Sequence, residues 1–337
     1  MWGVVQVVVY GAGAIGSLIG ARLHEAGVGV QLVGRKAHVD AINAKGLLLQ
    51  SQHGSRVVQI PATTSLEGTP DLILLTVKSQ DVTSACREIS EVRSIATVVT
   101  MQNGVRSDRE AADALSRARI VGCVLNVSAT YLEPGIVEQN TGIRLQIGAP
   151  FPEAAPRVDA VANLLVQAAH TEVVPDIARA RWTKLMANVN NAIMTITGLP
   201  IGTALRNRGL ARLAIATIRE GVKTVQLGGF GLDQSARART FRLMSTLPRP
   251  IAHLVFARRL AGDFPADSQF GPSTLQSLKR GSSSELDYLN GEIVTLGQRI
   301  GRATPYNSGL LQYGKQVFET RRNLSPEELL SKFNPPP

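Results

Sequence analysis

The sequence predicts two domains of different class: an α/β domain over residues 1–175 and an all-α domain over residues 176–337. Short apolar runs rich in Val, Ile and Leu alternate with helical segments and glycine turns as far as Pro175, a pattern typical of α/β sheets. From Asp176 onward the chain consists of long amphipathic helical stretches. A chain of 337 residues is long enough to give each domain its own core.

The first strand, turn and helix lie in residues 4–20, with the sequence VVQVVVYGAGAIGSLIG. Gly11 permits the tight turn, Gly13 lets an anion approach the backbone, and Gly16 lets the helix pack on the strand. The start of the helix offers free N–H groups to a pyrophosphate, so this segment predicts a dinucleotide site. The alternative is a glycine-rich turn that binds no ligand. The candidate cofactor contacts are Gly11, Ala12, Gly13, Ala14, Ile15 and Gly16.

The second predicted strand, residues 30–33, ends in Gly34, Arg35 and Lys36. In dinucleotide-binding folds an acidic residue about 20 positions after the glycines binds the ribose 2′-hydroxyl, whereas a basic residue suits a 2′-phosphate. Arg35 stands at that place, and we therefore expect NADP(H) as the cofactor. The alternative is an arginine on a surface loop.

The rest of the first half predicts a regular series of elements. Residues 17–26 continue as a helix that ends at Gly27, and residues 46–50 and 56–60 predict a hairpin-like excursion. The other predicted strands cover residues 71–77, 96–101, 119–127, 135–139, 144–147 and 171–174, and the other helices cover residues 81–90 and 156–168.

Two polar residues follow buried strands of this series. Lys78 comes after residues 71–77, and Asn103 lies in the Gln-Asn-Gly turn after residues 96–101. Ligands of open α/β sheets bind at the carboxyl ends of the strands, so both residues are candidate ligand contacts. Position alone is equally consistent with a surface lysine whose stem covers apolar surface. Asn-Gly turns also form without any function.

Helices of the second half are predicted over residues 177–192, 210–227, 234–244, 249–260, 274–279, 285–299 and 308–321. Lys184 and Asn188 are four residues apart in the first of them, so they share one helix face and can polarise and orient a carbonyl. The alternative is a Lys–Asn pair that faces solvent. Glu285 follows a run of serines at a helix start, where it is either a capping or a catalytic carboxylate. The tail, residues 323–337, ends in three prolines and predicts a loose segment outside the core.

The composition excludes several other classes of protein. The net charge is +10, from 36 basic and 26 acidic residues, but the basic residues are scattered and aromatic residues make up 4%. No nucleic-acid platform is predicted from this pattern. Cys86 and Cys123 lack the spacing of metal ligands, so we expect free thiols in a reducing cytosol and no metal. No signal peptide or membrane span is predicted, and a cytoplasmic location without a membrane partner follows as an expectation.

Six motifs, taken in order, resemble the ketopantoate reductases (2-dehydropantoate 2-reductases). They are GAGAIG at 11–16, LLTVKSQDV at 74–82, QNGV at 102–105, the A-x5-G element at 129–135, RWTKLMANVNN at 181–191 and SSSELDYLNGEIV at 282–294. The resemblance covers about residues 4–318. It implies a Rossmann-like N-terminal domain, an all-helical C-terminal domain, an active site in the cleft between them, and a small 2-oxo acid as the substrate.

The resemblance also implies roles for individual residues. Lys184 matches the catalytic lysine of the family, and Glu285 matches a carboxylate that contacts both cofactor and substrate. The substrate-binding candidates are Asn103, Asn188, Ser273 and Asn191. The cofactor candidates outside the glycine turn are Arg35, Lys78, Asn103, Ala129 and Glu285.

One departure from the family concerns the substrate. The family commonly has a second substrate asparagine eight residues after the lysine, followed by proline, where this chain has Ala192 and Ile193. Asn191 is the candidate replacement, and Asn190 remains open. The segment 228–271 also looks longer than in compact members, with an additional basic, apolar helix near residues 251–260.

The sequence therefore predicts NADPH-dependent reduction of ketopantoate to pantoate, with Lys184 as the general acid. One alternative is a reductase of a different 2-oxo acid within the same family. The other is a non-catalytic NADPH-binding redox sensor. A homodimer formed through the helical half is an arrangement that the sequence leaves open.

Overall fold

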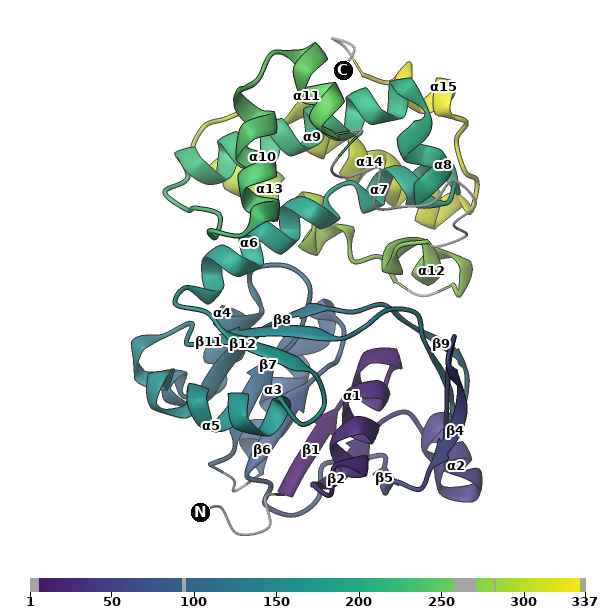
Figure 1. The fold of residues 1–337 in the computed structure, drawn as a ribbon, viewed down its shortest axis with the longest axis vertical. Coiled ribbons are helices and arrows are strands. Elements are labelled where there is room, and N and C mark those ends of the chain that lie inside the picture. Colours follow the sequence, from purple (N-terminus) through teal and green to yellow (C-terminus); the bar gives the residue numbers. More distant parts are fainter. Residues whose placement is uncertain (1–5, 93–94, 257, 259–270, 282, 334–337) are drawn as a thin grey trace. The chain divides into compact units, whose positions relative to one another are not determined.

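The computed structural model describes residues 6–92, 95–256, 258, 271–281 and 283–333. The chain divides into two compact units, residues 1–180 and 181–337, with the division inside helix α6 (Ile177–Asn188) and close to the predicted boundary after Pro175 (Figure 1). The first unit contains two sheets with helices, and the described residues of the second unit form helices and no strand, as the sequence predicts.

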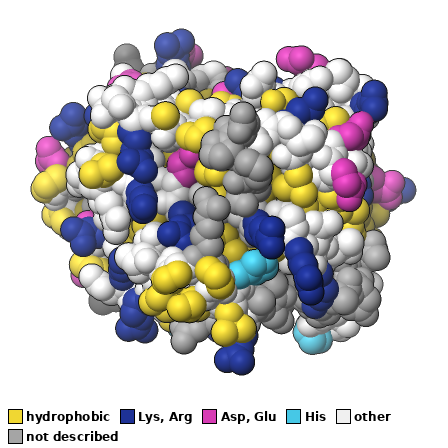
Figure 2. Space-filling view, turned by 90° about the horizontal axis from the view of Figure 1, so that it is seen from above, with side chains coloured by type: hydrophobic (Ala, Val, Ile, Leu, Met, Phe, Trp, Pro, Cys, Tyr) yellow, Lys and Arg dark blue, Asp and Glu magenta, His cyan; other side chains and the backbone are white. Residues whose placement is uncertain are grey.

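Charged side chains are spread over the face of the molecule that Figure 2 shows. On the face drawn in Figure 2, Lys and Arg side chains lie singly or in small groups among hydrophobic and neutral ones. This distribution agrees with the scattered basic residues of the sequence. Within the described residues, none of the helices has the length and apolar character required to cross a membrane.

An eight-stranded sheet forms the centre of the first unit. Its strand order is β12-β11-β8-β7-β6-β1-β2-β5, and all neighbouring pairs are parallel except β8 with β11. The strands are β1 (Gln6–Tyr10), β2 (Gly29–Val33), β5 (Ala62–Thr63), β6 (Leu72–Leu75), β7 (Thr97–Thr100), β8 (Ile120–Asn126), β11 (Arg144–Gly148) and β12 (His170–Val173). The chain moves from β1 to β2 on one side and later to β6 on the other. The glycine turn after β1 therefore lies where the direction of strand addition reverses, the usual ligand position in open α/β sheets.

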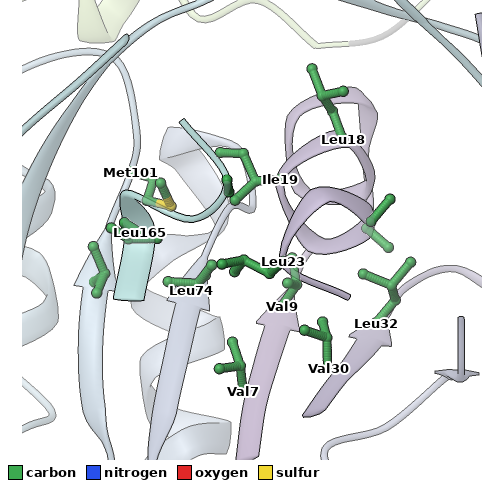
Figure 3. Packing of buried hydrophobic residues seen from close by; sticks show 14 of the residues in the cluster. Val7, Val9, Leu18, Ile19, Leu23, Val30, Leu32, Leu74, Met101 and Leu165 are labelled. Atoms are coloured by element: carbon green, nitrogen blue, oxygen red, sulfur yellow. The ribbon is translucent and has the colours of Figure 1, made fainter. Parts of the chain in front are cut away.

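Both faces of this sheet are covered by helices. Successive side chains of β1 point to opposite faces, so Val7 and Val9 belong to one apolar core while Val8 and Tyr10 belong to the other. Figure 3 shows Leu23 of helix α1 (Ala14–Glu25) lying against Val9 and Leu74 in the first core. Burial on both faces explains why these strands read as continuous apolar runs in the sequence.

In the described residues of the first unit, 6–92 and 95–180, five helices and three 3-10 turns accompany the two sheets. Besides α1 they are α2 (Lys36–Lys45), η1 (Ser79–Asp81), α3 (Val82–Glu91), α4 (Ser107–Ala112), η2 (Arg117–Arg119), η3 (Pro152–Ala154) and α5 (Ala155–Leu165). Helices α2 and α4 are not predicted by the sequence patterns. Helix α2 is short and polar on its exposed side, and it is held by the burial of His38, Val39 and Ile42.

A second sheet has the strand order β4-β3-β10-β9. Its strands are β3 (Leu47–Ser51), β4 (Gly54–Val58), β9 (Ala129–Glu133) and β10 (Ile136–Gln139). The predicted hairpin is confirmed by the antiparallel pair β3 and β4. The sequence did not predict that β3 pairs in parallel with β10, because periodicity carries no information about partners so distant in the chain.

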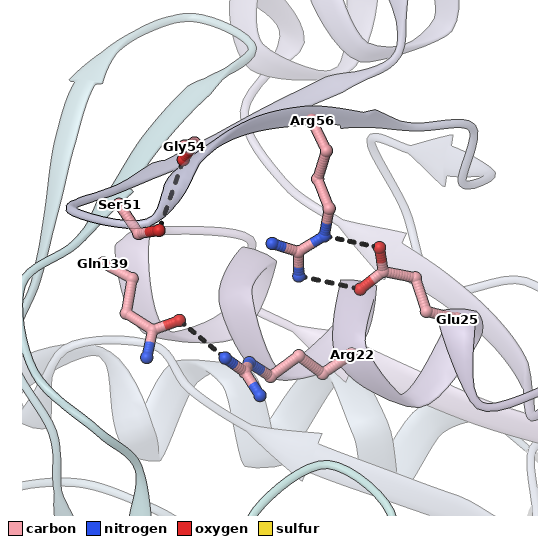
Figure 4. Close-up of polar contacts among 6 residues, drawn as sticks. All are labelled: Arg22, Glu25, Ser51, Gly54, Arg56 and Gln139. Atoms are coloured by element: carbon pink, nitrogen blue, oxygen red, sulfur yellow. Dashed lines mark hydrogen bonds and ion pairs between the residues drawn. The ribbon is translucent and has the colours of Figure 1, made fainter.

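Polar contacts attach this second sheet to helix α1 (Figure 4). The Arg56 guanidinium of β4 donates two hydrogen bonds to the Glu25 carboxylate, at 2.6 and 2.9 Å. This pairing holds the pKa of the Glu25 carboxyl below its usual value. The Arg22 guanidinium of α1 donates to the Gln139 amide oxygen of β10 at 2.8 Å. The helix that starts at the glycine turn is thus tied to two strands of the second sheet, the edge strand β4 and the inner strand β10.

The second unit packs its helices around the long helix α9. Its elements after α6 are α7 (Asn191–Thr197), α8 (Ile201–Arg206), α9 (Arg208–Leu227), α10 (Ala236–Thr246), α11 (Arg249–Phe256), α12 (Ser273–Lys279), η5 (Leu286–Tyr288), α13 (Asn290–Arg299), α14 (Pro305–Thr320) and α15 (Pro326–Leu330). Helix α9 contacts α8, α10, α11, α13, α14 and α15. Twelve of its residues are buried, which fits its central place.

Three predicted segments differ in the structure. The predicted helix 177–192 is broken, because α6 ends at Asn188, residues 189–190 form a turn, and α7 begins at Asn191. The predicted helix 285–299 is split into η5 and α13. Of the predicted helix 249–260, residues 249–256 form α11, and all later residues of that prediction except Arg258 lie outside the described residues.

The prediction of a loose tail from residue 323 is wrong for residues 323–333. Ser325 and Glu328 form a reciprocal capping box at the start of α15, and Leu329 and Phe333 are buried. The prediction rested on the terminal prolines, residues 335–337, which lie outside the described residues. A local cap and two apolar anchors outweigh the composition of the last residues.

Candidate active site

The glycine turn is held tightly against two neighbouring strands. The N–H groups of Gly11 and Ala12 donate to the Val33 carbonyl of β2, at 3.0 and 2.8 Å. The Thr76 hydroxyl, just beyond β6, donates to the Gly11 carbonyl at 2.8 Å. Gly11 has φ +111°, and a Cβ there would lie 2.5 Å from the Val77 nitrogen. The sequence assigned no role to Thr76, although it lies inside one of the six motifs.

Gly16 is closely surrounded by other atoms, whereas Gly13 is not. A Cβ on Gly16 would lie 2.4 Å from the Gly11 carbonyl oxygen and 2.5 Å from Thr76 Oγ1. A Cβ on Gly13 would meet only one atom, the Gly11 oxygen at 4.0 Å, and Gly13 is exposed. Gly16 thus allows the helix to pack, whereas Gly13 borders open space.

The first turn of α1 borders the same open space. Its N-cap is Gly13, no side chain caps it, and it contains no acidic residue. The N–H groups of Ala14, Ile15 and Gly16 are among the first amides of the helix and have no carbonyl partner within it. Open space beside a glycine and uncapped helix amides fit the pyrophosphate of a dinucleotide.

Arg35 lies next to this turn, at the start of α2. It is exposed, and its carbonyl accepts the N–H groups of His38 and Val39, while its side chain does not cap the helix. The preceding Gly34 packs so closely on the turn that a Cβ there would lie 2.9 Å from the Ala12 Cβ. The neighbouring Lys36 ammonium pairs with the Asp40 carboxylate at 2.8 Å. Of the two adjacent basic residues, Arg35 and Lys36, Lys36 therefore forms an ion pair within α2.

Lys78 and Asn103 belong to segments that the structure joins. Both residues are half-buried, Lys78 just beyond β6 and Asn103 just beyond β7. The Ser79 hydroxyl donates to the Asn103 carbonyl at 3.0 Å. The Gln102 amide donates to the Leu75 and Val77 carbonyls, at 2.7 and 3.2 Å. These bonds bring the two predicted ligand contacts to one edge of the main sheet, beside the glycine turn.

Ala129 is the first residue of β9, half-buried against the core beneath α1. The second sheet is tied to the start of α1 through His38, a residue that the sequence did not single out. His38 Nδ1 accepts the Gly135 N–H at 2.8 Å, so the neutral ring carries its proton on Nε2 and donates it to the Ser17 hydroxyl at 3.0 Å. Burial lowers the pKa of His38 to about 4. Its partners lie 21 and 97 positions away, which is why no local pattern reveals it.

Lys184 and Asn188 lie in α6 of the helical unit, and both are half-buried. Their neighbours fix the helix. The Thr183 hydroxyl accepts the Asp233 N–H at 3.0 Å, and the Trp182 ring packs on Phe230 with centroids 5.2 Å apart. Lys184 and Asn188 thus lie one turn apart on one helix, and their role in orienting a small substrate stays a prediction.

Glu285 precedes the 3-10 turn η5 and is half-buried. Its backbone carbonyl accepts the Tyr288 N–H at 2.9 Å, but its carboxylate does not cap the turn. The Leu286 N–H instead donates to the Ser284 hydroxyl at 3.1 Å. Of the two interpretations left open by the sequence, the capping carboxylate is wrong.

Asn191 and Ser273 belong to two helices that the structure joins. Asn191 begins α7 and is half-buried, whereas Ser273 begins α12 and is exposed. The Thr195 hydroxyl of α7 is hydrogen-bonded to the Asn191 carbonyl at 2.9 Å and to the Thr274 hydroxyl of α12 at 2.7 Å. Asn190 is 8% exposed and counts as buried, so Asn191 is the more exposed residue of the two.

The predicted residues thus form two groups. The first unit contains residues 11–16, Arg35, Lys78, Asn103 and Ala129, and the second contains Lys184, Asn188, Asn191, Ser273 and Glu285. No group of three or more His, Cys, Asp or Glu side chains suited to a metal ion occurs within the described ranges. Cys86 and Cys123 are free and buried, and burial raises the pKa of the Cys86 thiol to about 12.

Family models match both units of the chain. A model described as "Ketopantoate reductase PanE/ApbA" matches residues 7–150, and one described as "Ketopantoate reductase PanE/ApbA C terminal" matches residues 176–317. The chain is 30% identical to the 2-dehydropantoate 2-reductase of Pyrococcus horikoshii, over 90% of this chain and 94% of that protein. It is 29% identical to the 2-dehydropantoate 2-reductase of Pyrococcus abyssi, over 94% and 100%.

Solved structures show the same fold. A PanE/ApbA family ketopantoate reductase from Ralstonia eutropha JMP134 superposes with a TM-score of 0.80 at 29% identity, covering 94% of this chain and 99% of that one. A D-mandelate dehydrogenase in complex with NADH and anilino(oxo)acetate also reaches 0.80, at 21% identity and the same coverage, a likeness of fold alone. These matches confirm both the predicted fold class and the resemblance drawn from the six motifs, and they show that the chain is an oxidoreductase of the ketopantoate reductase family.

Proposed function

We propose that this protein reduces ketopantoate to pantoate with NADPH. The observation that carries the proposal is the placement of Lys184 and Asn188 one turn apart on a fixed helix, in a chain of the ketopantoate reductase family. The uncapped α1 start and the open space at Gly13 support a dinucleotide as the second reactant.

When bound, the reduced nicotinamide supplies the hydride that the ketone carbon receives. The Lys184 ammonium donates a hydrogen bond to the ketone oxygen, stabilises the negative charge that develops there, and gives that oxygen its proton. Glu285 holds a substrate hydroxyl and helps to orient Lys184. Asn103, Asn188, Asn191 and Ser273 orient the remaining polar groups of the substrate. Residues 11–16, Lys78 and Ala129 hold the cofactor.

The preference for NADPH rests on Arg35. Its guanidinium is exposed at the uncapped start of α2, beside the glycine turn, and no acidic side chain stands at this position. Lys36 is paired with Asp40 and contributes less. A D-mandelate dehydrogenase of the same fold is described with NADH, so the fold itself does not select the phosphate.

The test is the oxidation of NADPH and NADH measured against a panel of 2-oxo acids. We expect ketopantoate with NADPH to give the highest kcat/KM. In Arg35→Ser we expect kcat/KM for NADPH to fall about 10- to 100-fold, as for the loss of hydrogen bonds to a charged group, with little change for NADH. Lys36→Ser is the matched control and should change kcat/KM for NADPH by less than about threefold. A wild-type preference for NADH would overturn the role of Arg35.

A second candidate substrate is a bulkier 2-oxo acid. Ala192 replaces the family's second substrate asparagine, and Ala192 is fully buried and presents no polar group in its place. The panel therefore includes the 2-oxo acid that corresponds to mandelate, along with branched 2-oxo acids. A higher kcat/KM for one of these than for ketopantoate would select this candidate. Tight NADPH binding without consumption of any member of the panel would favour the redox sensor instead.

A further inference from the structure

A buried polar network connects the two segments of the helical unit that contain the candidate catalytic residues. Its members are the Val189 carbonyl after α6, Asn290 at the start of α13, Asn307 in the first turn of α14, and Glu220 in the middle of α9. Asn290 and Asn307 are fully buried, and Glu220 is 8% exposed. Polar groups at such burial are costly unless their partners are in place, so the network has one preferred arrangement.

Asn290 is the link between the two segments. Its amide Nδ2 donates one hydrogen bond to the Val189 carbonyl and one to Asn307 Oδ1, both at 3.0 Å. Both N–H bonds of the amide are thereby used, and the bond to Val189 joins residues 101 positions apart.

Glu220 fixes the side chain of Asn307, and Asn307 in turn accepts a hydrogen bond from Asn290. The Glu220 carboxylate accepts the Tyr306 N–H at 3.1 Å and the Asn307 N–H at 2.7 Å, which satisfies two amides in the first turn of α14. The Asn307 amide Nδ2 donates to the same carboxylate at 2.8 Å and to the Thr217 carbonyl at 3.3 Å. Asn307 Oδ1 is therefore presented to Asn290 from a fixed side chain.

The Val189 carbonyl lies at the junction between α6 and α7. Helix α6 ends at Asn188, and the Val189 N–H still donates to the Leu185 carbonyl at 2.9 Å, so Val189 closes the last turn of the helix that contains Lys184. Residues 189–190 then form the turn that leads into α7. A donor to this carbonyl fixes where α6 ends and thus where Lys184 and Asn188 lie.

The other segment is adjacent to Asn290 in sequence. Glu285 lies five residues before Asn290, and only the turn η5 and Leu289 separate them. We propose that Asn290 is a positioning residue, whose side-chain amide holds the end of α6 and the Glu285 turn in the mutual arrangement that proton delivery from Lys184 requires. This inference rests on the proposed function.

The test compares Asn290→Ala with Asn207→Ala as a matched control. Asn207 is the N-cap of α9 and accepts the Leu210 N–H at 3.0 Å, so its loss also removes an amide that stabilises this unit, but at a site bonded to neither segment. For Asn290→Ala we expect kcat for 2-oxo acid reduction to fall about 10- to 100-fold, since a shift of about 1 Å at a catalytic group costs that much. The dissociation constant of NADPH, measured by fluorescence titration, and the KM for the oxo acid should stay within about threefold. Asn207→Ala should lower the melting temperature and leave kcat per folded protein unchanged.

A second variant keeps the test decisive if Asn290→Ala does not fold. Asn307→Ala removes the acceptor and support of Asn290 but leaves its bond to Val189, and it should reduce kcat to a smaller extent. Where both single variants fold, the double variant should lose no more than Asn290→Ala alone, because the residues act in one network. A kcat of Asn290→Ala or Asn307→Ala per folded protein equal to that of Asn207→Ala would overturn the inference.

Lys184→Ala is measured in the same experiment to separate two kinds of failure. A large loss of kcat in Lys184→Ala without a loss in Asn290→Ala contradicts the positioning role alone. A normal kcat in Lys184→Ala contradicts the proposed function and the positioning role together.

Discussion

At the scale of single residues, the three glycines of the first turn serve three different purposes. Gly11 adopts a φ of +111° against β6, Gly16 leaves room for the Gly11 carbonyl, and Gly13 borders open space. The sequence alone predicts the turn at Gly11 and the close packing at Gly16, because both follow from the strand, turn and helix pattern, and the approach of a pyrophosphate to Gly13 stays a prediction. The sequence did not predict that the Thr76 hydroxyl fixes the turn, since that contact joins residues 65 positions apart.

Gly13→Ala and Gly16→Ala should therefore fail in different ways. In Gly16→Ala the added methyl meets two atoms at 2.4 and 2.5 Å, and we expect a loss of about 1–3 kcal/mol in the free energy of unfolding. In Gly13→Ala the methyl meets no atom closer than 4.0 Å, so unfolding should change by less than about 0.5 kcal/mol. NADPH binding should nonetheless weaken about tenfold or more in Gly13→Ala, because the methyl occupies the approach of the pyrophosphate. Urea denaturation and fluorescence titration measure the two effects, and wild-type affinity in Gly13→Ala would place the pyrophosphate elsewhere.

Glu285 shows the limit of sequence reasoning at this scale. A glutamate after serines at a helix start is either a capping or a catalytic carboxylate. The coordinates exclude the capping role, and the catalytic role stays a prediction. The Ser284 hydroxyl, rather than the Glu285 carboxylate, accepts an N–H of the turn. Asn290 is a similar case, because its partners Val189 and Asn307 lie far from it in the sequence.

At the scale of elements, most strands and long helices follow from hydrophobic periodicity, and the exceptions have local causes. The break between α6 and α7 falls at Val189 and Asn190, where no proline or glycine marks it. The buried Asn290 amide donates a hydrogen bond to the Val189 carbonyl at this break. The two residues are 101 positions apart, so no local stretch of sequence reveals the contact. Helix α2 and the pairing of β3 with β10 also depend on partners elsewhere in the chain.

The second sheet depends on the protonation state of His38. Protonation would place a hydrogen on Nδ1, facing the Gly135 N–H that this atom accepts. Burial lowers the pKa from 6.5 to about 4, so the neutral ring contributes stability that is fully present above pH 6.5 and is lost as the pH falls toward 4. The full shift corresponds to about 3 kcal/mol.

We expect the free energy of unfolding of the wild type to fall between pH 6.5 and pH 4 by an amount that is reduced in His38→Gln. Urea denaturation at a series of pH values measures it. His53→Gln is the control, because His53 is exposed in the hairpin between β3 and β4. Equal pH dependence in the wild type and in His38→Gln would show that His38 does not contribute to it.

At the scale of the whole molecule, the predicted site residues are distributed over both units. Residues 11–16, Arg35, Lys78, Asn103 and Ala129 lie in the α/β unit, whereas Lys184, Asn188, Asn191, Ser273 and Glu285 lie in the helical unit. The chain has a net charge of +10 and an isoelectric point near 10. On the face of Figure 2 its basic side chains are not concentrated in one patch. A general positive potential attracts small anions, and both proposed reactants are anions.

Salt should therefore weaken the capture of both reactants. Raising the ionic strength from about 0.02 to 0.5 M shortens the screening length severalfold, and we expect kcat/KM for NADPH and for the oxo acid to fall severalfold. The value of kcat serves as the internal control, because bound reactants have already been captured. Values of kcat/KM that do not change with salt would show that the net charge plays no part in capture.

In the proposed reaction Lys184 is the general acid of a 2-oxo acid reductase. The most direct measurement is the single-turnover oxidation of bound NADPH by ketopantoate in Lys184→Ala, beside Lys223→Ala as the control, since Lys223 is an exposed lysine of α9. We predict that Lys184→Ala slows the turnover about 10²- to 10⁴-fold while the dissociation constant of NADPH stays within about threefold, and that Lys223→Ala matches the wild type. A Lys184→Ala rate within about threefold of the wild type would contradict the account, because no general acid contributes so little.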